Sequence, residues 1–122
     1  MEKLVEYQGM VVPESYINAT DEERASVCNG CGTAGWKGKL VPNYIWGLWV
    51  KPACQVHDWM YHKGMTEQSK DEADMVFMRN LIRLINEAGG WLASIRRYRA
   101  TTYYNAVAEA GGAAFWDGKQ ES

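Results

Sequence analysis

The stretch CQVHDWMYHKG, residues 54–64, has an unusual set of polar side chains for a helix that packs into a core. Pro52 precedes it and Gly64 closes it, so the sequence predicts a helix between these two residues. Four residues with polar or reactive side chains are spaced i, i+3, i+4 and i+7 and therefore share one face: Cys54, His57, Asp58 and Tyr61. An inward carboxylate is costly unless it meets a cation or several donors, so this face is a candidate site.

The next helix has the same anomaly. Residues 69–88 are predicted to be helical, because Ser69 and Glu72 can form a capping box and Gly89-Gly90 can end the helix. Asp74 lies on the apolar stripe of this helix, three residues before Phe77. The loop between the two helices is short, which makes them antiparallel neighbours.

Two such helices can bring the Asp74 carboxylate to the far ring nitrogen of His57. This contact would fix the tautomer of the imidazole and stabilise its protonated form. The Tyr61 hydroxyl is a natural second donor to the same carboxylate. The pattern predicts a general base with an orienting carboxylate, for which water can be the nucleophile.

The rest of the chain predicts an all-α fold in a single domain, residues 1–122. A further helix is expected over residues 92–110, and a short one over 20–27 begins with a capping box of Thr20 and Glu23. Residues 1–20 look irregular, and strands are at most marginal because no alternating run exceeds a few residues.

Charge and composition restrict the partners. The net charge is −2, which gives no reason to expect nucleic acid. Residues 79–99 are basic, and we expect a solvated helix face there, with contact to phosphate-bearing partners as the alternative. The chain has no signal peptide and no membrane-spanning stretch, so we expect synthesis in the cytoplasm. Three cysteines cannot all pair with one another, and a disulfide framework is not the default.

The segment CNGCGTAGWKGKLVP, residues 28–42, is rich in glycine and must be a loop. Alternating glycines allow successive backbone carbonyl oxygens to point inward. Carbonyl oxygens together with the Asp58 carboxylate are the ligands that Ca²⁺ prefers.

Taken together, the motif His57-Asp58-x-x-Tyr61, the preceding CNGCG loop and the following Asp74 resemble the phospholipase A2 superfamily. The similarity is to its short viral and prokaryotic members, including those encoded by phages or prophages, and it covers residues 28–78. It implies a phospholipase A2-like fold with two antiparallel core helices and a glycine-rich calcium loop, to which this chain adds a C-terminal helix.

The resemblance also implies a reaction, the hydrolysis of the sn-2 ester of glycerophospholipids. His57 would activate water, and Asp74 and Tyr61 would orient His57. Calcium would be held by a set of four residues, through the side chain of the last and the backbone carbonyls of the others: Asp58, Cys28, Gly30 and Gly32. The family often joins a loop cysteine to the position of Cys54, and here the loop partner could be Cys31 or Cys28.

The same cysteines permit a different interpretation. Cys28-x2-Cys31 and Cys54-x2-His57 are two ligand pairs with spacings suited to tetrahedral Zn²⁺, so a small structural zinc-binding module is an alternative. A third possibility is a non-catalytic phage protein that keeps the fold.

Aromatic and basic residues point to a phospholipid membrane surface as the partner. Four tryptophans fall around the candidate site, with lysines interspersed: Trp36, Trp46, Trp49 and Trp59. Aromatic rings beside cations suit a lipid headgroup boundary, although core packing accounts equally well for part of this set. We therefore expect the protein to act at a membrane, and the resemblance to phage-encoded members implies a virion as the other expected location.

Overall fold

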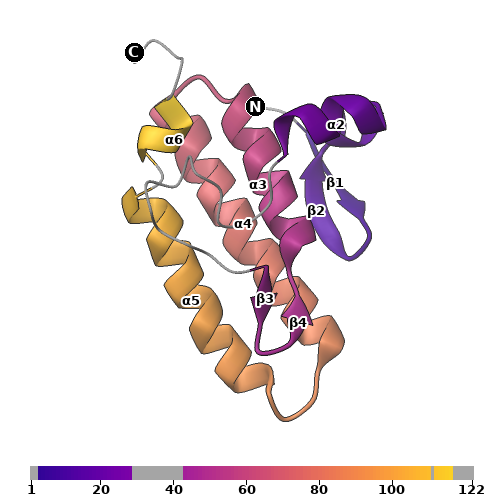
Figure 1. The fold of residues 1–122 in the computed structure, drawn as a ribbon, viewed down its shortest axis with the longest axis vertical. Coiled ribbons are helices and arrows are strands. Elements are labelled where there is room, and N and C mark those ends of the chain that lie inside the picture. The colour runs from indigo at the N-terminus through magenta and orange to yellow at the C-terminus, as the bar shows by residue number, and fades with distance from the viewer. Residues whose placement is uncertain (1–2, 29–42, 111, 117–122) are drawn as a thin grey trace.

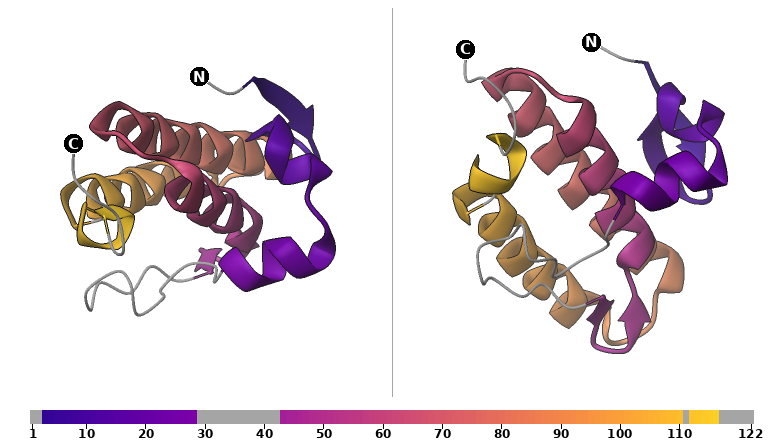
Figure 2. Two further views of the ribbon diagram at one scale, coloured as in Figure 1. Left: turned by 90° about the horizontal axis from the view of Figure 1, so that it is seen from above. Right: turned by 45° about the horizontal axis from the view of Figure 1, so that its top comes forward.

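The computed structural model of the chain describes residues 3–28, 43–110 and 112–116. The three long helices within these ranges are α3 (Lys51–Lys63), α4 (Glu67–Ala88) and α5 (Ala93–Ala110). Helices α3 and α4 lie side by side and run antiparallel, as predicted, and α5 packs along α4 (Figure 1). The views in Figure 2 show the N-terminal elements on one side of α3 and α4, with α5 and α6 on the other. None of these helices combines the length and the apolar character that crossing a bilayer requires.

The ends of α3 and α4 follow from local contacts. Gly64 has an ordinary φ of −71°, and a glycine is needed there because a Cβ would lie 2.8 Å from the Phe115 ring. The N-cap of α4 is Thr66, whose hydroxyl accepts a hydrogen bond from the Ser69 amide at 3.0 Å. The predicted start at Ser69 is therefore wrong by several residues, whereas the end before Gly89 is confirmed.

The all-α prediction is wrong, because the chain contains two small antiparallel sheets. Strands β1 (Leu4–Tyr7) and β2 (Met10–Pro13) form the first, so the prediction of an irregular N-terminal segment is also incorrect. Strands β3 (Tyr44–Ile45) and β4 (Leu48–Trp49) form the second. Strands of four and two residues are too short to produce an alternating pattern that sequence analysis can recognise.

Both hairpins turn through two residues with positive φ. The first turn has Gln8 and Gly9 at 51° and 81°, and the second has Trp46 and Gly47 at 46° and 79°. This is the type I′ geometry, in which Asn or Gly is preferred at the first position. A bulky residue there costs about 1–2 kcal/mol relative to glycine, so Trp46 is a strained position.

Strand β2 is attached to α4 by a buried side-chain amide. Asn80 is 0% exposed, and its Oδ1 accepts from the Val11 amide at 2.8 Å. Its Nδ2 donates to the Val11 carbonyl at 2.9 Å. Asn80 therefore pairs both main-chain groups of one residue in a strand that is buried along its whole length. The apolar core between α3, α4 and α5 continues beneath this strand.

Three short helices complete the fold, namely α1 (Glu14–Asn18), α2 (Asp21–Val27) and α6 (Gly112–Trp116). The predicted capping box of α2 is confirmed, since the Thr20 hydroxyl accepts from the Glu23 amide and the Glu23 carboxylate accepts from the Thr20 amide. Arg24 connects the two N-terminal helices by donating to the carbonyls of Tyr16 at 2.7 Å and Ala19 at 3.0 Å.

We expect the substitution Asn80→Leu to lower the free energy of unfolding by about 2–4 kcal/mol, because it leaves the buried amide and carbonyl of Val11 without a partner. Denaturant unfolding would measure the change. Asn86→Leu is the matched control on the same helix, since Asn86 is exposed, and it should change stability by less than about 0.5 kcal/mol. A similar loss in both variants would contradict the role given to Asn80.

Candidate functional site

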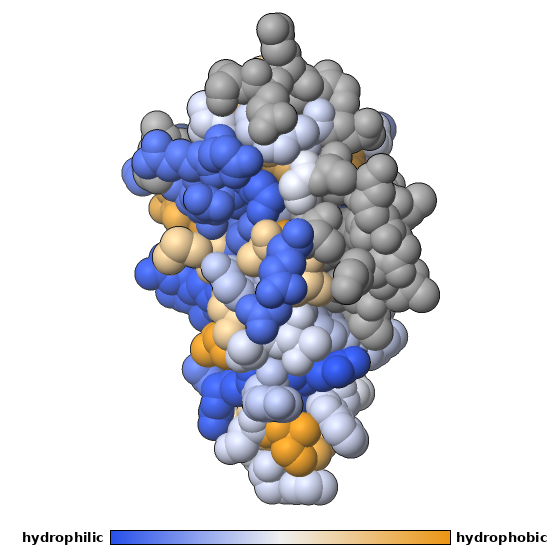
Figure 3. All heavy atoms as spheres, turned by 90° about the vertical axis from the view of Figure 1, so that its left-hand side faces the viewer, coloured by the Kyte–Doolittle hydropathy of each residue, from blue (hydrophilic) through white to orange (hydrophobic). Residues whose placement is uncertain are grey.

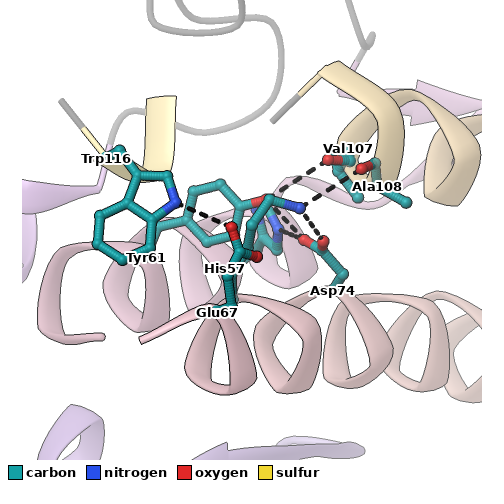
Figure 4. A network of polar contacts seen from close by, with 8 residues as sticks. His57, Tyr61, Glu67, Asp74, Val107, Ala108 and Trp116 are labelled. Atoms are coloured by element: carbon teal, nitrogen blue, oxygen red, sulfur yellow. Dashed lines mark hydrogen bonds and ion pairs between the residues drawn. The ribbon is translucent and has the colours of Figure 1, made fainter. Parts of the chain in front are cut away.

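A buried carboxylate, Asp74 on α4, lies at the centre of a network of polar contacts. Its Oδ1 is 2.8 Å from His57 Nε2 and accepts a hydrogen bond from the Tyr61 hydroxyl at 2.6 Å. Its Oδ2 accepts from Lys70 Nζ at 2.8 Å. Figure 4 shows these contacts converging on Asp74. The predicted contact between His57 and Asp74, and the predicted second donor Tyr61, are therefore confirmed as geometry.

The network also reaches the last turns of α5. The Tyr61 hydroxyl lies 3.5 Å from the Val107 carbonyl, and Lys70 Nζ lies 3.4 Å from the Ala108 carbonyl. Both contacts appear in Figure 4. Three helices thus supply groups to one polar cluster, which fixes how α5 packs against the pair α3 and α4.

The contact with Asp74 determines the tautomer of His57. An ionised carboxylate can only accept hydrogen bonds, so Nε2 of the imidazole must carry a proton. In neutral His57 the basic nitrogen is then Nδ1, on the opposite side of the ring, and this atom is also buried. The arrangement is that of a general base held by a carboxylate through its far nitrogen.

Burial and hydrogen bonding oppose each other at Asp74. Desolvation raises the pKa of this carboxyl, but the hydrogen bonds from His57, Lys70 and Tyr61 outweigh it and lower the pKa below its ordinary value. Asp74 therefore stays ionised although it is 2% exposed. The negative charge that orients His57 is maintained throughout the neutral range.

Desolvation lowers the pKa of His57 because the ring is fully buried. The hydrogen bond and the negative charge of Asp74 act in the opposite direction, and the positive charge of Lys70 lowers the pKa further. The Tyr61 hydroxyl has a raised pKa, caused first by burial and then by the charge of Asp74, so it remains a donor. At neutral pH His57 is unprotonated and able to accept a proton at Nδ1.

Lys70 is the member of the cluster that sequence reasoning missed. Its side chain is buried, with the whole residue 5% exposed, and it forms an ion pair with Asp74 one turn later on α4. The i, i+4 spacing of a lysine and an inward aspartate was the available signal. Lysine and aspartate often have this spacing on a helix surface, so it is weak evidence for a site. Lys70 belongs to the site because its side chain is buried.

The predicted calcium ligands are only partly within the described residues. Asp58 is half-buried on α3 beside His57, and Cys28 follows the last residue of α2. Gly30 and Gly32 lie outside the described residues. The negative charge of Asp58 raises the pKa values of Cys28, Tyr16 and Tyr61, in each case after the larger effect of burial. Asp58 thus places a negative charge near Cys28 and Tyr16, while the positive charge of Arg24 acts on the same two groups in the opposite direction.

The cysteines do not form the predicted zinc set. Cys54 is fully buried and disulfide-bonded, with its partner outside the described residues, so it offers no thiolate. Cys28 is a free thiol whose Sγ donates to the Gln55 carbonyl at 3.2 Å. Burial, and then the charge of Asp58, raise its pKa to about 12. Cys31 falls outside the described residues, and among the described ones no group of three or more His, Cys, Asp or Glu side chains could hold a metal ion.

A cavity in the described part of the chain lies apart from the Asp74 cluster. It has a volume of about 420 Å³ and lies between the N-terminal hairpin and the connection from α3 to α4, with Trp59, Lys63 and Glu72 in its walls. None of the residues that line it belongs to the Asp74 cluster. Trp59 is itself a core residue, 2% exposed, and its indole donates to the Ser15 hydroxyl at 3.0 Å.

No family model, no curated protein and no solved structure matches this chain. The chemistry of the site is therefore inferred from its own geometry, together with the motif in the sequence. That geometry consists of a neutral imidazole, an ionised carboxylate behind it and two further donors to this carboxylate.

The lowered pKa of His57 predicts how stability depends on pH. The ordinary pKa of histidine is 6.5, and the pKa of His57 in the folded protein is lower. As the pH falls below 6.5, the unfolded chain therefore binds a proton at this residue at a higher pH than the folded protein does. The free energy of unfolding should therefore decrease as the pH falls, by up to about 1.4 kcal/mol per pH unit.

Denaturant unfolding between pH 7 and pH 5 would measure this slope. His57→Gln should flatten it, whereas His62→Gln, which changes an exposed histidine of the same helix, should keep the parental slope. Identical slopes for the parent and His57→Gln would show that His57 is not the group responsible.

Proposed function

We propose that this chain is a calcium-dependent phospholipid hydrolase that cleaves the sn-2 ester with a water molecule activated by His57. The observation that supports it best is the buried cluster in which His57 Nε2 lies 2.8 Å from an Asp74 oxygen that also accepts from Tyr61. A carboxylate that accepts from Nε2 places the basic nitrogen of a neutral imidazole at Nδ1, and this is the tautomer that a general base with an orienting carboxylate requires. The resemblance of the motif to the phospholipase A2 superfamily points to the same reaction.

The chemistry follows from the tautomer. Nδ1 of His57 removes a proton from water as the water oxygen forms a bond to the ester carbonyl carbon. Asp74 stabilises the imidazolium that results, and Lys70 and Tyr61 hold the carboxylate in place. When the bond to the glycerol oxygen breaks, the imidazolium returns the proton to that oxygen. His57 is then neutral again.

Calcium would be held by the Asp58 carboxylate and by backbone carbonyls of the loop that begins at Cys28. The half-buried carboxylate of Asp58, whose negative charge acts on Cys28, supports this assignment. A bound Ca²⁺ would supply a Lewis acid for the ester carbonyl and an anchor for the phosphate. We do not favour the zinc-binding alternative, because the Cys54 thiolate it requires is replaced by a disulfide. The remaining alternative is a non-catalytic phage protein with the same fold. The following experiment distinguishes it from a hydrolase.

We expect the protein to release fatty acid from phospholipid vesicles in the presence of Ca²⁺ and to lose this activity in His57→Gln. Removal of the general base should reduce the rate by at least about 1,000-fold, a value within the range measured for a catalytic base that acts with its partners. Fatty-acid release would be followed by titration at constant pH.

His62→Gln is the control, because it removes an imidazole from the exposed side of the same helix. Loss of activity in this variant would indicate damage to the fold. Equal activity of parent and His57→Gln, or full activity in excess chelator, would exclude the mechanism. A folded parent that releases no fatty acid would favour the non-catalytic protein.

Asp58 provides a separate test of the cation site. Asp58→Asn keeps the shape of the side chain and removes the only formal charge in the proposed ligand set. Calcium affinity should therefore fall by at least about tenfold, the loss expected when about 1.4 kcal/mol of ligand binding is removed. Ca²⁺ should raise the melting temperature of the parent, and at the same Ca²⁺ concentration the rise should be smaller in Asp58→Asn.

Calorimetric titration and thermal unfolding would measure both effects. Asp71→Asn is a suitable control, since Asp71 is exposed on α4 and lies outside the proposed ligand set. If Asp58→Asn binds calcium as tightly as the parent does, the cation site is elsewhere in the chain.

A further inference from the structure

The exposed hydrophobic side chains are concentrated in two short segments. Of the eight large hydrophobic side chains that are exposed in the described part of the chain, six belong to these segments. They are Tyr44, Trp46 and Trp49 in the β3–β4 hairpin, Trp91 just before α5, and Ile95 and Tyr98 in its first turns. Single exposed hydrophobic residues are normal on a protein surface, but a cluster of this kind indicates an interaction site.

Hydrogen bonds join the two segments into one surface. Arg96 on α5 donates to the Trp46 carbonyl at 2.7 Å, and the Tyr103 hydroxyl donates to the Tyr44 carbonyl at 2.8 Å. Arg99 then lines a pocket of about 280 Å³ together with Tyr44 and Trp46. Ile95 precedes Arg99 by one helical turn, which makes the surface continuous along α5.

We call this surface the aromatic–cationic face and define it by Tyr44, Trp46, Trp49, Trp91, Ile95 and Arg99. Figure 3 views the side on which α5 lies, where hydrophilic side chains in blue alternate with pale and hydrophobic ones.

The charged residues of the two segments all have the same sign. Residues 43–56 and 91–108 contain no aspartate or glutamate, and their charged residues are Lys51, Arg96, Arg97 and Arg99. Lys51 Nζ lies 5.9 Å from the centre of the Trp49 ring, and Arg99 Cζ lies 5.7 Å from that of Tyr103. The whole chain has a net charge of −2, so the aromatic–cationic face is a local positive region on an acidic protein. It is complementary to an anionic partner.

Neither the turn geometry nor packing within the described chain favours a tryptophan at position 46. It adopts a left-handed φ of 46° at the tip of the hairpin, where asparagine or glycine would be favoured. Its side chain is 59% exposed, so packing within the described chain offsets little of this strain. A strained and exposed aromatic residue is typical of a position that serves contact with a partner.

We propose that the aromatic–cationic face docks on bilayers of anionic phospholipid, with Trp46 at the headgroup boundary and Arg99 and Lys51 against lipid phosphates. Indole and phenol rings favour this boundary, and the lysine and arginines favour a negatively charged membrane surface. A nucleic acid could use the same cations, but it offers no apolar layer for Ile95 and Trp46. The purpose of this docking rests on the hydrolase activity proposed above. The docking itself can be measured without catalysis.

Helix α5 connects the aromatic–cationic face to the Asp74 cluster. Tyr103, which bonds to the hairpin, and Val107, whose carbonyl lies near the Tyr61 hydroxyl, are four residues apart on α5. Arg99 and Ile95 precede Val107 by eight and twelve residues, about 12 and 18 Å along the helix axis. The face and the cluster are therefore joined by one rigid element, with the face toward its N-terminal end.

Binding would be measured by co-sedimentation with sucrose-loaded vesicles of phosphatidylglycerol or phosphatidylcholine, in chelator so that no hydrolysis occurs. The parent should bind phosphatidylglycerol vesicles at least about 10-fold more tightly than phosphatidylcholine vesicles. Added salt should weaken this preference, because it screens the attraction between the cations of the face and the anionic lipid. Trp46→Asn should bind at least 10-fold more weakly while its melting temperature stays the same or rises, because asparagine suits the turn. Arg99→Gln should lose most of the preference for the anionic lipid.

Met75→Gln is the matched control, because Met75 is 65% exposed on α4 and lies outside the aromatic–cationic face. It should bind vesicles like the parent. Unchanged binding by both Trp46→Asn and Arg99→Gln would overturn the docking surface, as would tighter binding of a single-stranded DNA oligomer than of either vesicle. Vesicle binding through this face without fatty-acid release in calcium would leave the docking surface intact and refute the hydrolase. Fatty-acid release from vesicles at the parental rate by the same two variants would refute the docking surface alone.

Discussion

The buried negative charge of Asp74 is the constraint on which the helical part of this structure depends. An isolated carboxylate in an apolar interior costs several kcal/mol, so its burial requires donors from the surrounding elements. His57 and Tyr61 come from α3 and Lys70 from α4, and two of these donors also contact carbonyls near the end of α5. A shift of any of the three helices by one turn would separate at least one donor from its acceptor. The polar cluster thus specifies a packing that apolar contacts alone would allow to vary.

The same cluster explains how one set of groups can combine structural and chemical roles. The donors keep Asp74 ionised, and burial keeps His57 neutral, so the two partners differ in charge state at neutral pH. Lys70 balances the charge of the carboxylate and lowers the basicity of the imidazole. A weakly basic, neutral histidine is suited to accept a proton and to return it in the same reaction cycle.

The two hairpins show how similar turns can meet different requirements. Both have positive φ at two residues, but the N-terminal hairpin is held against α4 by the Asn80 amide and buries its second strand. The β3–β4 hairpin is instead held by its backbone carbonyls, which accept from Arg96 and Tyr103 on α5. Its aromatic side chains are therefore free to remain at the surface, where Trp46 and Trp49 are exposed.

The sequence by itself determined those features that depend on residues close together in the chain. The spacing of His57, Asp58 and Tyr61 on one face, the inward position of Asp74 and the ends of the long helices near glycines follow from helical periodicity and local capping. Only the tertiary structure decided whether a given side chain is buried. Lys70 looks like a surface lysine in the sequence, Trp59 and Trp46 look alike, and strands of two to four residues leave no periodic pattern. Their burial, exposure and pairing depend on contacts between segments that are distant in the chain, such as Asn80 with Val11 and Arg96 with Trp46.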